Sequence, residues 1–225
     1  MSLEGAAVSL AAAVISAVFA FLVFRQWISR HKAFQFSWSV GLAMFAVAAF
    51  TQFLAEAYGW SDGVYRVYYF VSAPLVAVLG VGSAFLVSRK LGLAFAAYTV
   101  VLAAAFAWVV FTAPVDAAKL LQPIPAGNGF PDSVRIWSPV FTIPGSLALI
   151  GIALLSYWRT RFVSNLGIAA GAIVAAGSGA LATLGITWVL YLGELVGIAL
   201  MFWGFLLSRE PAKVPKPEGE RVSAT

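Results

Sequence analysis

The chain has 225 residues, of which 62% are hydrophobic and 10% are charged, and its mean hydropathy is +0.93. Roughly a quarter of the residues of a soluble domain are charged, so this composition excludes an ordinary soluble protein and indicates an integral membrane protein. The lack of cysteine excludes disulfides, iron–sulfur clusters and thiolate catalysis, and a single histidine, His31, excludes a bis-histidine haem or a histidine-rich metal site. We predict no metal and no cofactor.

Seven apolar stretches, each near the roughly 20 residues that a bilayer requires, predict an all-α bundle of seven transmembrane helices. The predicted spans are residues 6–24, 36–57, 65–87, 91–112, 138–158, 163–184 and 186–207. They form one transmembrane domain, residues 1–208, in which the lipid bilayer is the first partner. The remaining residues, 209–225, are polar and proline-rich, so we expect a disordered cytoplasmic tail without an effector domain.

The basic residues predict the orientation of the bundle. Eleven lysines and arginines follow the first, third, fifth and seventh spans, and three lie on the opposite side. The positive-inside rule therefore predicts an outside N-terminus and a cytoplasmic C-terminus, in a multi-pass protein of the plasma membrane. Glu4 precedes the first span and basic residues follow it, which is the reverse of a signal peptide, so we expect this span to be retained. The pI near 9.7 reflects these flanks, and we expect no nucleic-acid partner.

The connection between the fourth and fifth spans, residues 113–137, is long and rich in helix breakers. Its prolines and glycines are Pro114, Pro123, Pro125, Gly127, Gly129 and Pro131. One continuous helix is therefore excluded. Two interpretations stay open, an irregular solvated loop or a lid over an outward-facing cavity.

An acid, Glu194, lies about two helical turns inside the seventh predicted span. A carboxylate at that depth costs several kcal/mol unless it is protonated, paired or facing a wet cavity. Tyr191 lies one turn before it, and Gly193 and Gly197 flank it at a spacing that allows a neighbouring helix to approach closely. We expect another polar group to face Glu194.

The second and third spans carry polar residues near the same outer surface. Gln52 and Glu56 lie one turn apart before the connecting turn, and Arg66 and Tyr69 follow it. One interpretation is an interfacial aromatic belt with a structural arginine–carboxylate pair. The other is a ligand or proton pocket in which Arg66 neutralises one acid and holds an anionic ligand. The predicted pocket residues are Glu194, Glu56, Arg66, Gln52, Tyr69 and Tyr191.

Small residues and prolines predict the packing of the other spans. Gly167 and Gly171 form a small-xxx-small face, typical of tight helix packing or of an oligomer contact. Pro74 and Pro144 lie inside helical spans, where each frees a backbone carbonyl and can kink its helix. Residues 83–90 also resemble residues 203–210. Two interpretations stay open, a duplication of three spans around a linking fourth span, or a likeness of composition between apolar helices with basic inner ends.

The segments Leu54-Ala55-Glu56 and Tyr65-Arg66-Val67-Tyr68-Tyr69, followed by Pro74, resemble the seven-helix N-terminal sensor region of some bacterial histidine kinases. Those regions carry an acid late in the second helix, an arginine followed by aromatics at the start of the third, and a proline within it. The resemblance implies an input module that detects a small molecule or a membrane state and passes a helix movement to the cytoplasm. Because no kinase domain follows, signalling would require a separate cytoplasmic or membrane partner protein.

Three functions therefore remain open. The first is a receptor-like or regulatory protein that binds a small ligand or lipid in an outward-facing pocket. The second is a proton-coupled transporter in which Glu194 exchanges the proton. The third is an accessory subunit of a larger complex, with Glu194 bonded to Tyr98, Thr183 or a partner chain. An enzyme that uses Glu56 and Glu194 as an acid–base pair has the least support, and we assign no catalytic residue.

Overall fold

The structure is a computed structural model that describes residues 3–122, 127–183 and 188–208, and these residues form helices and no strand. The long helices are α1 (Leu3–Arg30), α2 (Ala33–Tyr58), α3 (Asp62–Val87), α4 (Arg89–Thr112), α6 (Trp137–Thr160), α7 (Val163–Thr183) and α8 (Trp188–Leu207). Two short elements, η1 (Lys119–Leu121) and α5 (Asp132–Arg135), lie between α4 and α6. The all-α prediction is confirmed. The predicted tail, residues 209–225, lies outside the described residues.

Six stretches of the described chain are long and apolar enough to cross a membrane, and they comprise α1, α2, α3, α4, α6 with α5, and α8. The apolar part of α7, Val163–Gly179, is shorter. The first predicted span, 6–24, is the middle of a longer helix, because the polar residues that mark the membrane boundary continue the helix to Arg30. The chain is therefore a multi-pass membrane protein by the length and apolarity of its helices.

Local chemistry explains where several helices begin and end. The side chains of Ser61 and Ser88 accept hydrogen bonds from the amides of residues three positions later, which caps the first turns of α3 and α4. Gly59 ends α2 with a φ of 88°, and Arg161 ends α6 with a φ of 58°. A positive φ reverses the chain at once, so α2–α3 and α6–α7 are joined by tight turns.

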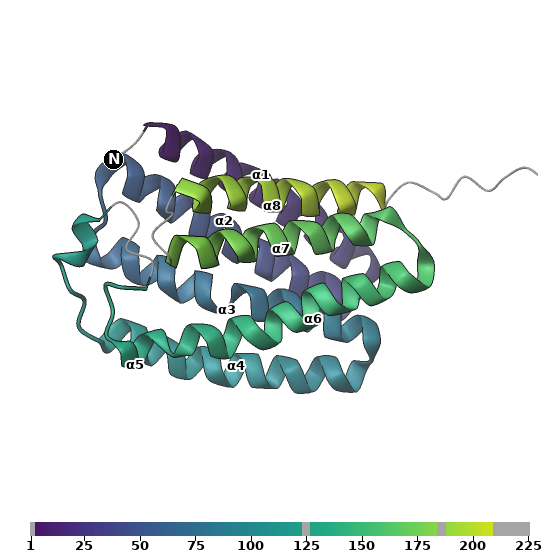
Figure 1. Ribbon diagram of the computed structural model, residues 1–225. Helices are drawn as coiled ribbons and strands as arrows, with labels where there is room; N and C mark the ends of the chain where they lie inside the picture. The colour runs from purple at the N-terminus through teal and green to yellow at the C-terminus, as the bar shows by residue number, and fades with distance from the viewer. Residues whose placement is uncertain (1–2, 123–126, 184–187, 209–225) are drawn as a thin grey trace, which may run out of the picture.

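Six of the long helices form a closed ring in the order α1, α2, α3, α6, α7 and α8, with α8 packing back against α1 (Figure 1). The fourth helix, α4, lies outside this ring and packs against α3. Its apolar window is only 17% buried, compared with 56% for that of α3. The two sets of three helices that the duplication hypothesis pairs therefore form the two halves of the ring, and α4 connects them from outside.

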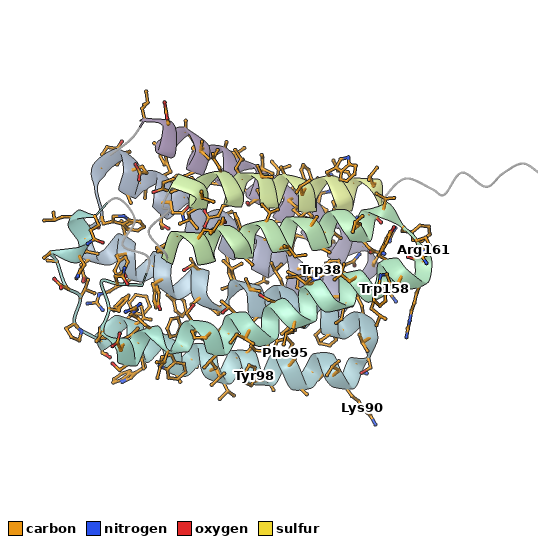
Figure 2. All side chains as sticks on the ribbon, in the orientation of Figure 1. Trp38, Lys90, Phe95, Tyr98, Trp158 and Arg161 are labelled. Carbon is orange, nitrogen blue, oxygen red and sulfur yellow. The ribbon has the colours of Figure 1, made fainter. Side chains whose placement is uncertain are left out.

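The two ends of the bundle differ in character. One end, which we name the loop end, carries the N-terminus and the connection between α4 and α6 (Figure 1). The opposite end, which we name the basic end, carries the α1–α2, α3–α4 and α6–α7 turns. Lys90 lies there on α4, and Trp158 and Arg161 lie there near the α6–α7 turn (Figure 2). The basic residues of these three turns are Arg30, Lys32, Arg89, Lys90, Arg159 and Arg161.

Both predicted kink prolines lie in helices that meet at glycines. Pro74 is buried inside α3, and Pro144 lies inside α6 beside Gly145. A Cβ atom added to Gly145 would lie 2.6 Å from the backbone of α3, and one added to Gly80 would lie 2.8 Å from the Gly145 carbonyl oxygen. The backbones of α3 and α6 therefore touch at this point, which only glycine permits.

The predicted packing glycines all lie at the contact between α7 and α8. A Cβ added to Gly193 would lie 2.1 Å from the Ser178 side chain, and one added to Gly171 would lie 2.4 Å from the Gly197 carbonyl oxygen. Gly167 faces the backbone of α8 in the same way. The close approach holds the residues that neighbour Gly193, including Glu194, at a fixed position in the ring.

The interior of the ring is apolar in its middle and toward the basic end. Its core includes Phe19, Leu42, Leu79, Leu149, Met201 and Phe205, which come from α1, α2, α3, α6 and α8. These side chains leave a void of only about 20 Å³. Such a volume holds about one water molecule at most. We name these six residues the apolar layer.

Candidate functional site

Five polar side chains meet inside the loop-end half of the ring, and we name them the acid–amide network. They are Gln52, Glu56, Tyr68, Tyr191 and Glu194. The Tyr191 hydroxyl donates to Glu56 Oε1 at 2.6 Å. The Gln52 amide Nε2 donates to Glu194 Oε1 at 3.2 Å and lies 3.4 Å from the Tyr68 hydroxyl. Two of these bonds therefore join α2 to α8, which are 135 and 142 residues apart at the bonded positions.

Helix periodicity explains how these side chains reach one another. Gln52 and Glu56 are four residues apart on α2, and Tyr191 and Glu194 are three apart on α8, so each pair lies on one helix face. Both helices pack against α1 rather than broadly against each other. Long side chains therefore span the remaining distance across the ring. Shorter polar residues at these positions would not make the same bonds.

Four of the five network side chains are buried, and the fifth, Glu194, is partly exposed. The exposed fraction is 1% for Gln52, 5% for Glu56, 8% for Tyr191 and 9% for Tyr68. A polar group in such surroundings costs free energy unless it is hydrogen-bonded, and a charged group costs more. Within the described residues the ion pairs are Arg66–Asp62 and Arg135–Asp132, so no arginine or lysine of that part neutralises Glu194.

Two buried oxygen atoms of this half of the ring have no hydrogen-bond donor among the described residues. They are Gln52 Oε1 and Ser9 Oγ. Ser9 is 1% exposed and follows Val8, which packs against the cluster of Ala182, Leu190 and Tyr191. Most buried polar atoms in proteins are hydrogen-bonded, so an exception needs a physical reason. A bound group that donates hydrogen bonds to these oxygen atoms would be such a reason.

The structure brings together four of the six predicted pocket residues, namely Gln52, Glu56, Tyr191 and Glu194. Arg66 lies elsewhere. Its Nε donates to Asp62 Oδ2 at 2.7 Å, Nη1 donates to the Val110 carbonyl, and the guanidinium lies 5.9 Å from the centre of the Phe130 ring. Arg66 therefore ties the start of α3 to the end of α4, and its partner is Asp62 rather than either glutamate of the network.

Tyr69 also faces away from the network. Its ring packs 5.1 Å from that of Phe130 and 5.8 Å from that of Phe106. Tyr68 precedes it by one residue, and successive residues on an α-helix point about 100° apart, so the two tyrosines serve different surfaces. Tyr68 is the network member that is absent from the predicted pocket residues. Its position one helix turn inward from Tyr65, opposite Gln52, was the available signal.

The connection between α4 and α6 packs against the outer end of α3. The Gly129 amide donates to the Tyr65 hydroxyl at 3.1 Å, and the Phe130 ring stacks 5.0 Å from that of Tyr65. Leu120, Phe130 and Val134 are buried in the same cluster. The connection therefore covers the α3–α4 side of the loop end in its described part. Pro123 and Pro125 lie outside the described residues.

The structure describes one of the two side chains that the sequence suggests as partners of Glu194, namely that of Tyr98. Tyr98 donates its hydroxyl hydrogen to the Val140 carbonyl at 2.9 Å, between α4 and α6, so it is not the partner of Glu194 (Figure 2). The side chain of Thr183 lies outside the described residues. Glu194 instead accepts a hydrogen bond from Gln52.

Comparison with protein families, with curated proteins and with solved structures gives no match. The site is therefore interpreted from its own geometry.

Proposed function

We propose that the protein is a receptor-like or regulatory membrane protein that binds a small ligand at the acid–amide network. Seven helices span the membrane in this proposal, with the loop end outside and the basic end in the cytoplasm, as the positive-inside rule predicts. The ligand enters from the outer side. A separate partner protein responds to the resulting helix movement, as the resemblance to kinase sensor regions implies.

The observation that carries this proposal is the buried Gln52 amide. Its Nε2 atom donates to Glu194, while its Oε1 atom has no donor among the described residues. A ligand that carries N–H or O–H groups would donate to Gln52 Oε1 and to the Glu194 carboxyl together. Each such bond gains more than it would in water, because leaving a buried acceptor unpaired costs about 1–3 kcal/mol. Small amines and hydroxyl compounds have the required chemistry.

The apolar layer favours a receptor over a transporter. A transported ligand or proton needs a polar path to the other side of the membrane, and such paths are lined by polar or ionisable groups. Below the network, α8 continues with Ile198, Met201 and Phe205, all buried in the apolar core. The apolar layer therefore separates the network from the basic end, which favours binding at one side of the membrane.

The first experiment measures the melting temperature of the purified protein in lipid nanodiscs with a panel of small amines and polyols. At 100 times its dissociation constant, a ligand adds about 2.7 kcal/mol of stability. For a chain of this size that corresponds to roughly 5–10 °C. We expect at least one compound to give this shift with wild type and with Glu4→Gln, an exposed acid at the same end. The shift should vanish in Glu194→Gln and in Gln52→Leu.

The transporter alternative is tested on the same proteins in liposomes that contain a pH-sensitive dye. Proton-coupled flux in wild type that disappears in Glu194→Gln would replace the receptor proposal by transport. A ligand-induced shift that persists unchanged in Glu194→Gln would move the ligand site away from the network.

A further inference from the structure

A groove of about 530 Å³ opens on the side of the bundle between α2 and α4, toward the basic end. Val81 and Phe85 of α3 form its floor, Phe36 and Val40 of α2 form one wall, and Val100 belongs to the opposite wall on α4. The groove exists because α4 packs on α3 and not broadly on α2. It shares no lining residue with the acid–amide network.

The groove presents apolar surface although two hydroxyl groups line it. Ser37 Oγ donates to the Val78 carbonyl at 2.6 Å, and Thr99 Oγ1 donates to the Phe95 carbonyl at 2.8 Å. Both hydroxyl hydrogens are thereby used within the protein. A polar ligand would gain few hydrogen bonds along these walls, whereas a hydrocarbon chain would bury apolar area against them. From Ala33 to Val40 the groove follows about 10 Å of α2, measured by helix rise.

The mouth of the groove has the chemistry of a lipid headgroup region. His31 ends α1 with a φ of 51°, which turns the chain sharply and leaves this residue in the lining. The Trp27 ring lies 6.2 Å from the His31 ring and 4.9 Å from that of Phe36. Tryptophan is enriched at the level of lipid headgroups, since its ring is apolar and its N–H is polar.

The charge around the mouth is of one sign. Arg30 and Lys32 flank His31 in the sequence, and Arg89 and Lys90 begin α4 on the other side of the groove. The three turns of the basic end contain no aspartate or glutamate in the described chain. A phosphate group would therefore meet cations and no competing carboxylate.

We propose that this groove binds an anionic glycerophospholipid, with one acyl chain between α2 and α4 and the headgroup phosphate beside His31 and Lys32. The apolar walls select a lipid over a soluble phosphate compound. The unopposed positive charge selects an anionic headgroup over a zwitterionic one.

The test is lipid binding to the detergent-purified protein, measured by native mass spectrometry with phosphatidylglycerol and phosphatidylcholine of identical acyl chains. Wild type should bind one phosphatidylglycerol about fivefold or more tightly than phosphatidylcholine, the effect of roughly one nearby cation. Ala96→Phe places a ring in the groove and should abolish this site. Ala97→Phe, an exposed neighbour on α4, adds the same ring outside the groove and should bind as wild type does.

A second pair of variants tests the headgroup contact without changing the groove. Lys32→Gln should reduce the preference for phosphatidylglycerol about fivefold, while Arg159→Gln, at the same end of the bundle on α6, should leave it unchanged. Equal affinity for the two lipids, or wild-type binding by Ala96→Phe, would overturn the proposal. Equal losses in Lys32→Gln and Arg159→Gln would also overturn it, since they would indicate diffuse attraction to the whole basic end.

Discussion

The bond between Gln52 and Glu194 predicts an energetic coupling between α2 and α8. Consider the two single variants Gln52→Met and Glu194→Met and the double variant, all of similar side-chain length. Either single change leaves one polar partner of the 3.2 Å bond in the ring interior without the other. The double change removes both, and replacing both partners by apolar groups of the same shape can be nearly neutral. We therefore expect the double variant to be more stable than the sum of the single effects predicts.

The expected coupling free energy is about 1 kcal/mol. Hydrogen bonds between membrane helices contribute about 0.6 kcal/mol on average and up to about 1.7 kcal/mol. The depth of Gln52, which is 1% exposed, favours the upper part of this range. The additional contact of Gln52 with the Tyr68 hydroxyl at 3.4 Å is lost in both comparisons and cancels in the double-mutant cycle.

The assay is unfolding of the purified protein in mixed micelles, followed by tryptophan fluorescence, for the four members of the cycle. The control cycle combines Gln52→Met with Tyr98→Phe, because Tyr98 donates to Val140 at a different helix contact. The control should be additive within about 0.3–0.5 kcal/mol. A Gln52–Glu194 coupling no larger than that of the control would refute the reasoning that this bond joins the two helices.

Three further predictions concern two glycine contacts, each with a control variant, and the position of Arg66. Gly145→Ala should destabilise the fold by about 1–3 kcal/mol, because its Cβ would lie 2.6 Å from the backbone of α3. Gly151→Ala, on the same helix, has no atom within 4 Å of the added Cβ and should be neutral or slightly stabilising. The melting temperatures of the two variants test this difference. Gly193→Ala, whose Cβ would lie 2.1 Å from a serine of α7, should destabilise similarly, and the open Gly177→Ala should not, as chemical unfolding would measure. Arg66→Met should cost about 1–2 kcal/mol through its lost bonds to Asp62 and α4 while leaving ligand binding at the network unchanged, and a loss of binding without a loss of stability would contradict this placement.

The sequence predicts those parts of the site that follow from helix periodicity and from the free-energy cost of burying an acid. An acid deep in an apolar helix must have a partner, so Glu194 marked the interior without any structure. Gln52 and Glu56 share a helix face by their spacing alone. The partners of these residues on other helices were not predictable, because the same face of α2 could have met α3, α8 or lipid. Only the order of helices around the ring decided that Gln52 meets Glu194.

Arg66 shows the opposite case. Its depth matched that of Glu56, which made an ion pair across the α2–α3 turn reasonable. The structure instead turns Arg66 toward Asp62, one helical turn earlier, and toward the end of α4. Depth in the membrane follows from sequence position, but direction around the helix axis depends on which neighbours pack there. Tyr68 and Tyr69 are adjacent in the sequence but contact different neighbours for the same reason.

The sequence by itself determined that this chain is an all-α membrane protein, since apolar stretches of about 20 residues satisfy their own backbone hydrogen bonds only as helices in a bilayer. It also determined which residues are costly to bury and which glycines permit close packing. The tertiary structure decided that α4 lies outside the ring, that an apolar layer closes the interior, and that a groove opens beside α3. These features depend on contacts between helices far apart in the chain, and in an apolar solvent such contacts follow from the fit of side chains rather than from hydrophobic pattern.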